Sequence, residues 1–309
     1  MAKYKRIPRQ FSEQSTTKMI LMVLHRLTMF VACTLAFTYL LGTDLSLIFK
    51  ALGSLPLIFL GSCALHNIGL LGHEGTHFTL AKKHYDSALI GTLFSAMVPF
   101  HFNTGFAVTH ALHHWHTNTE KDPDLEVFLP FKNFWSRFFL ARSKASRVYL
   151  KDTILLAMGK LPHPNQVGLK DKELFKLAKI NLFFSSLFLV IYGTLIFQYP
   201  TTFGLAFLLI YFTAVFLSGI RPYMEHVGTN SGDFSNSRTF SSPLLDYVYG
   251  TINYHLAHHM HPMVPAYNLP KLHQWMLKEG HIDPSKAVKS SSLKETLQQM
   301  NRGLYGPQH

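Results

Sequence analysis

Long apolar stretches alternate with polar segments along the chain. Four of them have about the length of a membrane-spanning helix, which needs roughly 20 predominantly apolar residues. They are Leu27–Gly42, which could extend back to Met19, then Ala51–Gly72, Asn181–Phe197 and Phe203–Ile220. The longer form of the first span would place Arg26 where its side chain could snorkel to the interface. The pattern therefore predicts an all-α integral membrane protein with four transmembrane helices.

The connectors inside each pair of spans are short, so the four helices are expected to form two hairpins. The even number of spans puts the N-terminal arm, the long segment 73–180 and everything after residue 220 on one side. These parts hold nearly all the Lys and Arg, which collect in cytoplasmic loops. We therefore expect a multi-pass protein with both termini in the cytoplasm, in either a bacterial inner membrane or the endoplasmic reticulum. Residues 1–309 are taken as a single domain with a cytoplasmic arm at 1–17 and a polar tail at 282–309.

A fifth apolar run, Ala88–Thr109, is long enough to span but does not fit this scheme. A single crossing would place His77 and His110 on opposite faces of the membrane. Pro99 and Asn103 in its middle also disfavour one straight helix. We therefore expect a broken or re-entrant element at the membrane boundary.

Composition supports the membrane interpretation. Hydrophobic residues make up 48% of the chain and charged residues 15%, against about 25% charged in ordinary soluble domains. The net charge of +12 fits basic cytoplasmic loops better than binding to nucleic acid, and no nucleic-acid partner is expected. Cys33 and Cys63 both lie in apolar runs, which favours small buried hydrophobes over a disulfide or a thiolate metal site.

Histidine carries the candidate chemistry. The chain has 19 histidines, and eight of them fall in three clusters with the sequences HEGTH, HALHH and HLAHH. The clustered residues are His73 and His77, then His110, His113 and His114, then His255, His258 and His259. On a helix, spacings of three and four residues place imidazoles on one face, where they could bind metal. Neutral imidazole suits iron, copper and zinc alike, so spacing alone leaves the metal open.

The isolated histidines have a plainer interpretation as hydrogen-bonded structural residues. His281 is expected to be solvent-exposed in the tail. The set comprises His25, His84, His163, His273, His281 and His309.

The three clusters resemble the histidine boxes HxxxH, HxxHH and HxxHH of the membrane fatty acid desaturase superfamily, in the same order. The context also matches. TNTEKDPD after the second box resembles the family's acidic tail, and NYHLAHHMHPMVPAYNLPKLH surrounds the third box. The resemblance covers roughly Ile68 to His273.

The resemblance implies four membrane helices beneath a cytoplasmic, histidine-rich helical cap that holds two iron ions, with dioxygen as co-substrate. It also implies one more ligand before the third box, for which His226 is the candidate. In animal acyl-CoA desaturases an Asn four residues before that histidine helps to hold a water at one iron. Here that position is Pro222, so the water site is in doubt. The implied ligand set is His73, His77, His110, His113, His114, His226, His255, His258 and His259.

Other polar residues near the boxes could support the ligands. A ligating histidine usually donates its second N–H to a carboxylate or carbonyl, although loop acids are as often simply solvated. The candidate acids are Glu74, Asp122, Asp124, Glu225 and Asp246. Four further histidines could be donors to the site or ordinary interface residues, namely His66, His101, His116 and His261.

The resemblance implies a fatty acid desaturase-like oxidoreductase that places a double bond in an acyl chain carried by a lipid, coenzyme A or acyl-carrier protein. It implies no separate catalytic residue beyond the metal ligands. The sequence has no Rossmann glycine fingerprint, and HPNQVG at 163–168 is not a fused cytochrome b5 motif. Electrons are therefore expected from a separate ferredoxin, rubredoxin or cytochrome b5. Basic residues at 130–151 could attract such an acidic carrier or equally contact phospholipid head groups: Lys132, Arg137, Arg142, Lys144, Arg147 and Lys151.

Two alternatives remain at this point. The same boxes could serve a hydroxylase or ketolase of a carotenoid, terpenoid or alkane. A histidine-rich metal transporter would place ionisable ligands inside the spans, yet the expected spans contain only His66 among Asp, Glu and His. The transporter is therefore disfavoured.

Overall fold

The computed structural model describes residues 5–302, apart from the side chains of residues 134, 138 and 139. His309 lies outside the described residues. The described chain is predominantly helical, with two short strands. In chain order the elements are α1 (Arg9–Ser12), α2 (Thr16–Gly42), α3 (Leu47–Thr76), α4 (His84–Ser95), α5 (Asn103–His116), α6 (Pro123–Phe128), α7 (Phe134–Phe139), α8 (Ala141–Ala157), α9 (Asp171–Gln198), the π-helical turn η1 (Pro200–Gly204), α10 (Leu205–His226), β1 (Arg238–Phe240), α11 (Pro243–Tyr249), α12 (His255–Met260), the 3-10 turn η2 (Ala266–Asn268), α13 (Leu269–Lys278), β2 (Val288–Ser290) and α14 (Leu293–Arg302).

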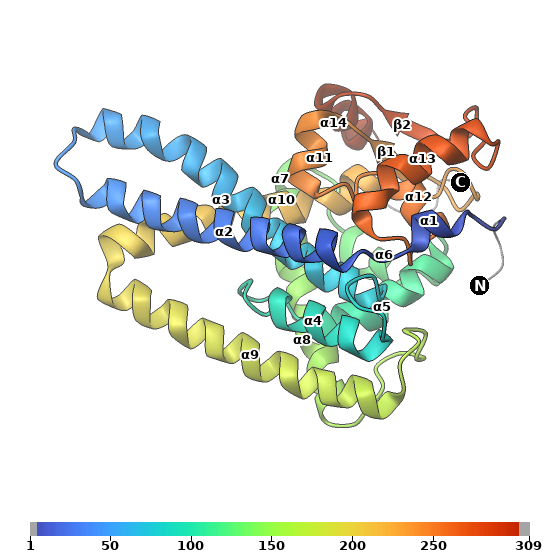
Figure 1. Cartoon of the computed structure of the whole chain (residues 1–309), viewed down its shortest axis with the longest axis horizontal. Helices are drawn as coiled ribbons and strands as arrows, with labels where there is room; N and C mark the ends of the chain where they lie inside the picture. The colour runs from blue at the N-terminus through green and yellow to red at the C-terminus, as the bar shows by residue number, and fades with distance from the viewer. Residues whose placement is uncertain (1–4, 303–309) are drawn as a thin grey trace.

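Four helices are long and apolar enough to cross a membrane. These candidates are Arg9–Gly42, Leu47–Thr76, Asp171–Gln198 and Pro200–His226, which include α2, α3, α9 and α10. Each contains one of the four expected spans and is longer than it. The four helices extend together to the left in Figure 1, whereas the shorter helices gather around their other ends. The protein is thus a membrane protein by the length and apolar character of these helices.

Arg26 on α2 is buried and does not snorkel to an interface, so that expectation is wrong. Its Nη1 donates a hydrogen bond to the Asn67 carbonyl of α3 at 3.0 Å. Asn67 in turn donates to the carbonyls of Tyr247 and Val248. This network ties the first two long helices to α11, because a buried guanidinium needs hydrogen-bond acceptors.

The apolar run Ala88–Thr109 is broken, as expected. Helix α4 ends at Ser95, a turn follows, and α5 begins at Asn103. The amide of Thr104, the second residue of the new helix, is paired outside the helix, because Asn181 Oδ1 on α9 accepts from Thr104 N at 3.1 Å. Thr153 Oγ1 on α8 accepts from Gly105 N at 2.9 Å. These contacts position the start of the helix that carries the second histidine box.

Two glycines allow α3 and α4 to cross at backbone contact. A Cβ at Gly75 would lie 2.7 Å from the Cα of Gly91 and 2.9 Å from the Ser87 carbonyl oxygen. Backbone atoms cannot move aside as a flexible side chain can. Gly75 lies between His73 and His77, so this crossing sets where the first box sits.

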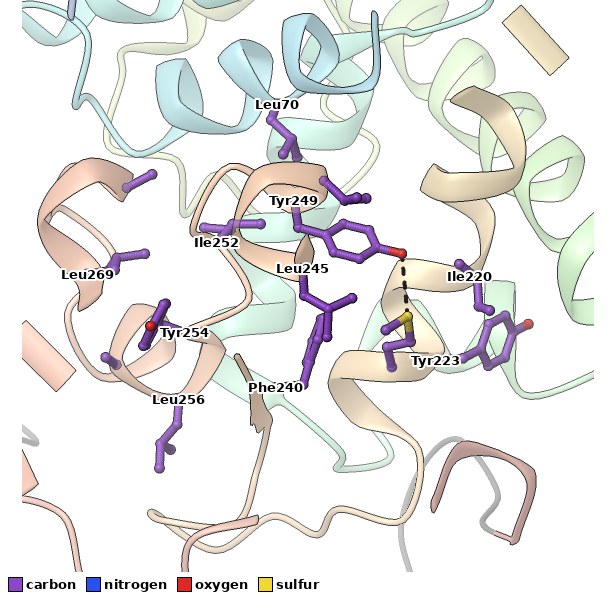
Figure 2. Close-up of a cluster of buried hydrophobic side chains, with 14 of the residues drawn as sticks. Leu70, Ile220, Tyr223, Phe240, Leu245, Tyr249, Ile252, Tyr254, Leu256 and Leu269 are labelled. Carbon is purple, nitrogen blue, oxygen red and sulfur yellow. Dashed lines mark hydrogen bonds between the residues drawn. The ribbon is translucent and has the colours of Figure 1, made fainter. Parts of the chain in front are cut away.

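The short elements share one apolar core with the ends of the long helices. Figure 2 shows this cluster, in which Tyr249 of α11 extends toward α10 and donates a hydrogen bond to Met224 Sδ at 3.4 Å. Leu70 of α3, Phe240 of β1 and Leu256 of α12 are buried in the same cluster. The core thus joins the segments that carry the first and third boxes.

The segment expected as a polar tail folds back onto this core as far as residue 302. Strand β2 pairs in parallel with β1, with Thr239 opposite Lys289, and Met300 of α14 is fully buried. His281 is half-buried with its ring 4.6 Å from Trp275, so its expected exposure is wrong. The apolar residues of α14 recur at helical spacing, so they share one face of the helix, and this is the face that packs on the core.

Candidate metal centre

The three histidine boxes come together from three helices. His73 lies in the last turns of α3 and His77 caps that helix. The second box lies on α5, and the third opens α12. His226 is the final residue of α10. Its ring lies within hydrogen-bonding distance of the second box and of the third box. The expected set of nine imidazoles is therefore assembled in one place.

Five of the nine form one cluster. His110 Nε2 lies 3.0 Å from His77 Nε2 and 3.1 Å from His114 Nε2, and His114 Nε2 lies 3.1 Å from His258 Nε2. The ring of His73 lies 4.6 Å from that of His258. One potential ligand atom from each of these five residues falls within 4.8 Å of all the others.

The other four form a second cluster around His226. Its Nε2 lies 3.3 Å from His113 Nε2 and 3.1 Å from His255 Nε2. His259 Nε2 lies 3.1 Å from His255 Nε2. The second and third boxes each contribute to both clusters, so the two clusters are neighbours.

The hydrogen-bond partners show that these nitrogens fit a cation. Carbonyl oxygens of Asn236 and Ile252 accept from His226 Nδ1 at 3.0 Å and from His255 Nδ1 at 3.3 Å. A neutral ring with a protonated Nδ1 has a bare lone pair on Nε2. Two bare lone pairs 3.1 Å apart repel each other unless a cation lies between them. Ligands about 2.1 Å from one ion are themselves roughly 3.0–3.4 Å apart, so the observed separations suit a shared metal.

Further polar groups set the ring orientations. His113 Nδ1 lies 3.0 Å from both oxygens of Asp122, and His259 Nδ1 lies 3.2 Å from Thr117 Oγ1. Because the Thr117 hydroxyl already donates to the His113 carbonyl, it accepts from His259. Such contacts select the tautomer that leaves Nε2 free for metal.

Sequence reasoning missed Thr117, Asn118 and Asn236. Asn118 donates through Nδ2 to the Asn236 carbonyl at 2.8 Å and through its backbone N–H to Asp122 at 2.9 Å. It therefore holds the end of the second box against the loop that orients His226. Its left-handed φ of 58° is tolerated by Asn better than by most residues. The available signal was its place in TNTEKDPD, directly after the box.

The acidic candidates differ in what they contact. Glu74 Oε1 lies 3.6 Å from His73 Nδ1, and Glu225 Oε1 lies 3.4 Å from His255 Nδ1. Asp124 Oδ2 lies 3.5 Å from His113 Nδ1. Asp246, which was only one of the acids that could orient a ligand, instead accepts from Asn253 and from Tyr254.

The clustered histidines differ in pKa, because burial and neighbouring charges affect each ring to a different extent. Burial, helped by the charge on His113, lowers the pKa of His77 to about 3. Burial also lowers the pKa of His110, His114 and His258 well below the usual value. Neutral imidazole is the form that binds metal, so these rings are ready ligands at neutral pH.

His113 differs from the other clustered histidines outside the long helices, because its pKa is raised and theirs are lowered. Burial acts to lower its pKa, but the charges of Asp122 and Asp124 outweigh burial and raise that pKa to about 9. The ring is therefore protonated without metal, and it must release the Nε2 proton to bind one. The adjacent carboxylates then keep the Nδ1 proton in place.

The four unassigned histidines line two cavities beside the clusters. His66 and His101 line a cavity whose walls also include His73, His110, His113, His226 and His255. His116 and His261 line a second, outer cavity that reaches His114 and His259. Both clusters can therefore be approached from two directions.

Two of the basic residues expected to meet an electron carrier are not free on the surface. Arg137 is buried and donates to the carbonyls of Phe131 and Met300. Arg142 is half-buried and lines the cavity beside the clusters. Lys132 and Lys151 are exposed, so only part of that stretch could contact a carrier or a membrane surface.

Comparison with known proteins shows the family of this chain. A sequence model of the family described as "Fatty acid desaturase" matches residues 49–282, which include all nine clustered histidines. A "Fatty acid desaturase" of Bacillus subtilis (strain 168) is 24% identical over 283 residues, covering 83% of this chain and 76% of that protein. The chain belongs to the fatty acid desaturase family.

Proposed function

We propose that this protein uses two iron ions and dioxygen to introduce a double bond into a fatty acyl chain carried by a lipid, coenzyme A or acyl-carrier protein. The supporting observation is the division of nine imidazoles, eight of them buried and that of His114 half-buried, into a five-membered and a four-membered cluster. Each cluster offers enough nitrogen ligands for one ion, and the nine would be the metal ligands. Bound iron would supply the oxidation chemistry, with electrons from a separate ferredoxin, rubredoxin or cytochrome b5.

The chain's own residues would hold and shield the reacting carbon. The cavity beside the clusters continues along α10 from His226 to Tyr211, about 22 Å of helix axis. Val98, Ala214 and Val215 give part of it an apolar lining, which suits an acyl chain. Phe106 stacks on His110 with 4.6 Å between ring centroids and lines the same cavity, where it would help to exclude water.

The proposed topology places both termini and the short helices in the cytoplasm, with α2–α3 and α9–α10 as two transmembrane hairpins. The convergence of His77, at the end of α3, with His110, on α5, supports this proposal. The segment between them would then lie at the membrane boundary without crossing. A single domain spanning residues 1–309 would contain all of these parts.

Product analysis tests the activity. The protein would be expressed in a host that also supplies a matched reductase and carrier, followed by mass spectrometry of lipids and acyl carriers. A dehydrogenated acyl chain, absent from cells that express His226→Ala, is expected. An oxygenated product would identify a hydroxylase or ketolase instead. No new product with an iron-loaded protein and a working electron supply would overturn the proposal.

A further inference from the structure

The cavity beside the metal centre has a polar wall that metal binding does not explain. Its lining includes Arg142 of α8, Arg221 of α10, His66 of α3 and His101 from the turn before α5. None of these four belongs to the two histidine clusters. An acyl chain needs an apolar tunnel alone, so two guanidinium groups here call for another explanation.

Arg142 carries a positive charge without a balancing partner. Its guanidinium forms no hydrogen bond or ion pair with any residue in the described part of the chain. Burial lowers the pKa of Arg142; the neighbouring Tyr149 and Tyr211 act to raise that pKa, and the charge of Arg221 acts to lower it. Desolvating an unpaired charge is unfavourable unless a counter-charge arrives. Asp124 and Glu225 line the same cavity, but Asp124 lies 3.5 Å from His113 and Glu225 lies 3.6 Å from Arg221. Arg142 is therefore the cation on this wall that is left for an anion to meet.

Other atoms on the same wall also lack partners. Arg221 Nε lies 3.6 Å from Glu225 Oε1, but Arg221 Nη1 is buried without a hydrogen-bond partner. His66 Nε2 and His101 Nδ1 are buried and unpaired as well. Buried polar atoms are nearly always hydrogen-bonded, so three such atoms around one cavity point to a polar group that binds there.

We propose that the cavity binds the substrate through an anionic oxygen group, a carboxylate or a phosphate, held by Arg142 with the help of Arg221. The planar guanidinium fork matches both groups. The apolar tail would follow Val98 and Val215 toward the long helices. This inference rests on the proposed function, and it adds that the oxidised carbon lies close to the anionic end, because His73 and His255 wall the same cavity.

Ligand binding to the full-length, iron-loaded protein in nanodiscs tests this without turnover, under anaerobic conditions. Three probes with the same saturated chain would be compared: palmitic acid, palmitoyl lysophosphatidic acid and neutral methyl palmitate. At least one anionic probe should bind more tightly than the methyl ester. Arg142→Gln should weaken that anion by about 10- to 100-fold and leave the methyl ester unchanged. The anionic probe whose binding is weakened by the substitution shows whether the cavity binds a carboxylate or a phosphate.

Arg147→Gln is the matched control, because Arg147 lies exposed on the same helix. It should change the affinity for neither kind of probe. Equal binding of anionic and neutral probes to the wild-type protein would overturn the inference, as would equal losses in the two variants. If Arg142→Gln does not fold, Arg142→Lys decides. Weaker binding of the anion alone supports the inference, and unchanged binding of both probes overturns it.

The binding test and the product test can fail separately. Oxidation of acyl chains by a protein without anion selectivity would leave the proposed function standing and remove only this inference. The opposite result is also possible, in which Arg142→Gln loses the selectivity for anions but the wild-type protein forms no oxidised product. It would contradict the proposed reaction and leave the anion site standing.

Discussion

His113 Nδ1 lies 3.0 Å from both carboxylate oxygens of Asp122, and both side chains are buried. The pair joins the second box to the loop that follows it. Asp122 also caps α6 by accepting from Asp124 N. One carboxylate thus orients a candidate ligand, raises its basicity and starts a helix.

Asp122→Asn should weaken iron binding without unfolding the protein. Asn can still accept the capping hydrogen bond, but it removes the charge that holds the Nδ1 proton of His113. Losing such a partner typically reduces metal affinity about 10- to 100-fold. Iron retained during titration with a chelator measures this. Glu126→Gln, an exposed change in the same short helix, should retain wild-type iron, and equal retention in Asp122→Asn would contradict the assigned role.

His226→Ala should abolish turnover and lower the iron content. His226 Nε2 lies close to the Nε2 atoms of both His113 and His255, so loss of this ring removes the centre of the four-membered cluster. Elemental analysis and product analysis would be run on the same preparations. His163→Ala is the control, because His163 contacts Asp152 away from the clusters. Full iron content with near-normal turnover in His226→Ala would exclude this residue from the site.

Gly75→Ala should destabilise the protein by about 1–3 kcal/mol and reduce iron loading. Its new Cβ would meet backbone atoms of α4 at under 3.0 Å, which would displace the first box. Thermal unfolding in detergent measures the change. Gly193→Ala on α9 has nothing within 4 Å of the new Cβ, so it should be neutral or slightly stabilising. Equal melting temperatures for the two variants would show that the close helix crossing is unimportant.

The segment 78–109 should begin and end on the same side of the membrane. His77 and His110 share a cluster, so residues near the two ends of this segment must face the same compartment. Lys82→Cys and Lys121→Cys, both at exposed positions, should label with a membrane-impermeant thiol reagent from the cytoplasmic face. Asp44→Cys, exposed in the connector between α2 and α3, should label only from the opposite face. Labelling of the two lysine positions from different faces would overturn the topology.

Without metal, the protein should lose stability as the pH falls from about 7.5 to about 5.5. Burial keeps six clustered rings outside the long helices neutral in the folded state, whereas unfolded histidines gain a proton near pH 6.5. The unfolded chain therefore binds more protons in this range, which favours unfolding by about 1.4 kcal/mol per proton and pH unit. These rings are His77, His110, His114, His255, His258 and His259.

His113 acts in the opposite direction. Its pKa is raised to about 9, so its contribution is full below pH 6.5 and declines between pH 6.5 and 9. Six opposing rings outweigh it in acid. Thermal unfolding of chelator-treated protein across this pH range measures the sum. A melting temperature that rises as the pH falls would contradict the assigned protonation states.

The amino-acid sequence by itself determined the features that depend on neighbours along the chain. The lengths of the apolar runs located the four long helices, and Pro99 with Asn103 located the break between α4 and α5. Spacings of three and four residues placed the rings of each box on one helix face. These are local properties, because helical geometry is the same wherever the helix packs.

Only the tertiary structure decided how the boxes combine. His110 and His113 are three residues apart, yet one joins the cluster with His77 and the other the cluster with His226. That division depends on the crossing of α3, α5, α10 and α12, which spacing within a box does not contain. The partners of the Nδ1 atoms, such as the Asn236 carbonyl, likewise come from distant loops.

Burial of charge was also decided by packing. Arg26 and Arg137 were expected at surfaces, because a long basic side chain usually keeps its charge in water. Each is instead buried against backbone carbonyls that distant segments bring to it. The final polar segment also packs against distant parts of the chain, because β2 pairs with the edge of β1 and Met300 is buried in the core. Composition measures how polar a segment is, but whether it finds partners depends on contacts between residues far apart in the chain.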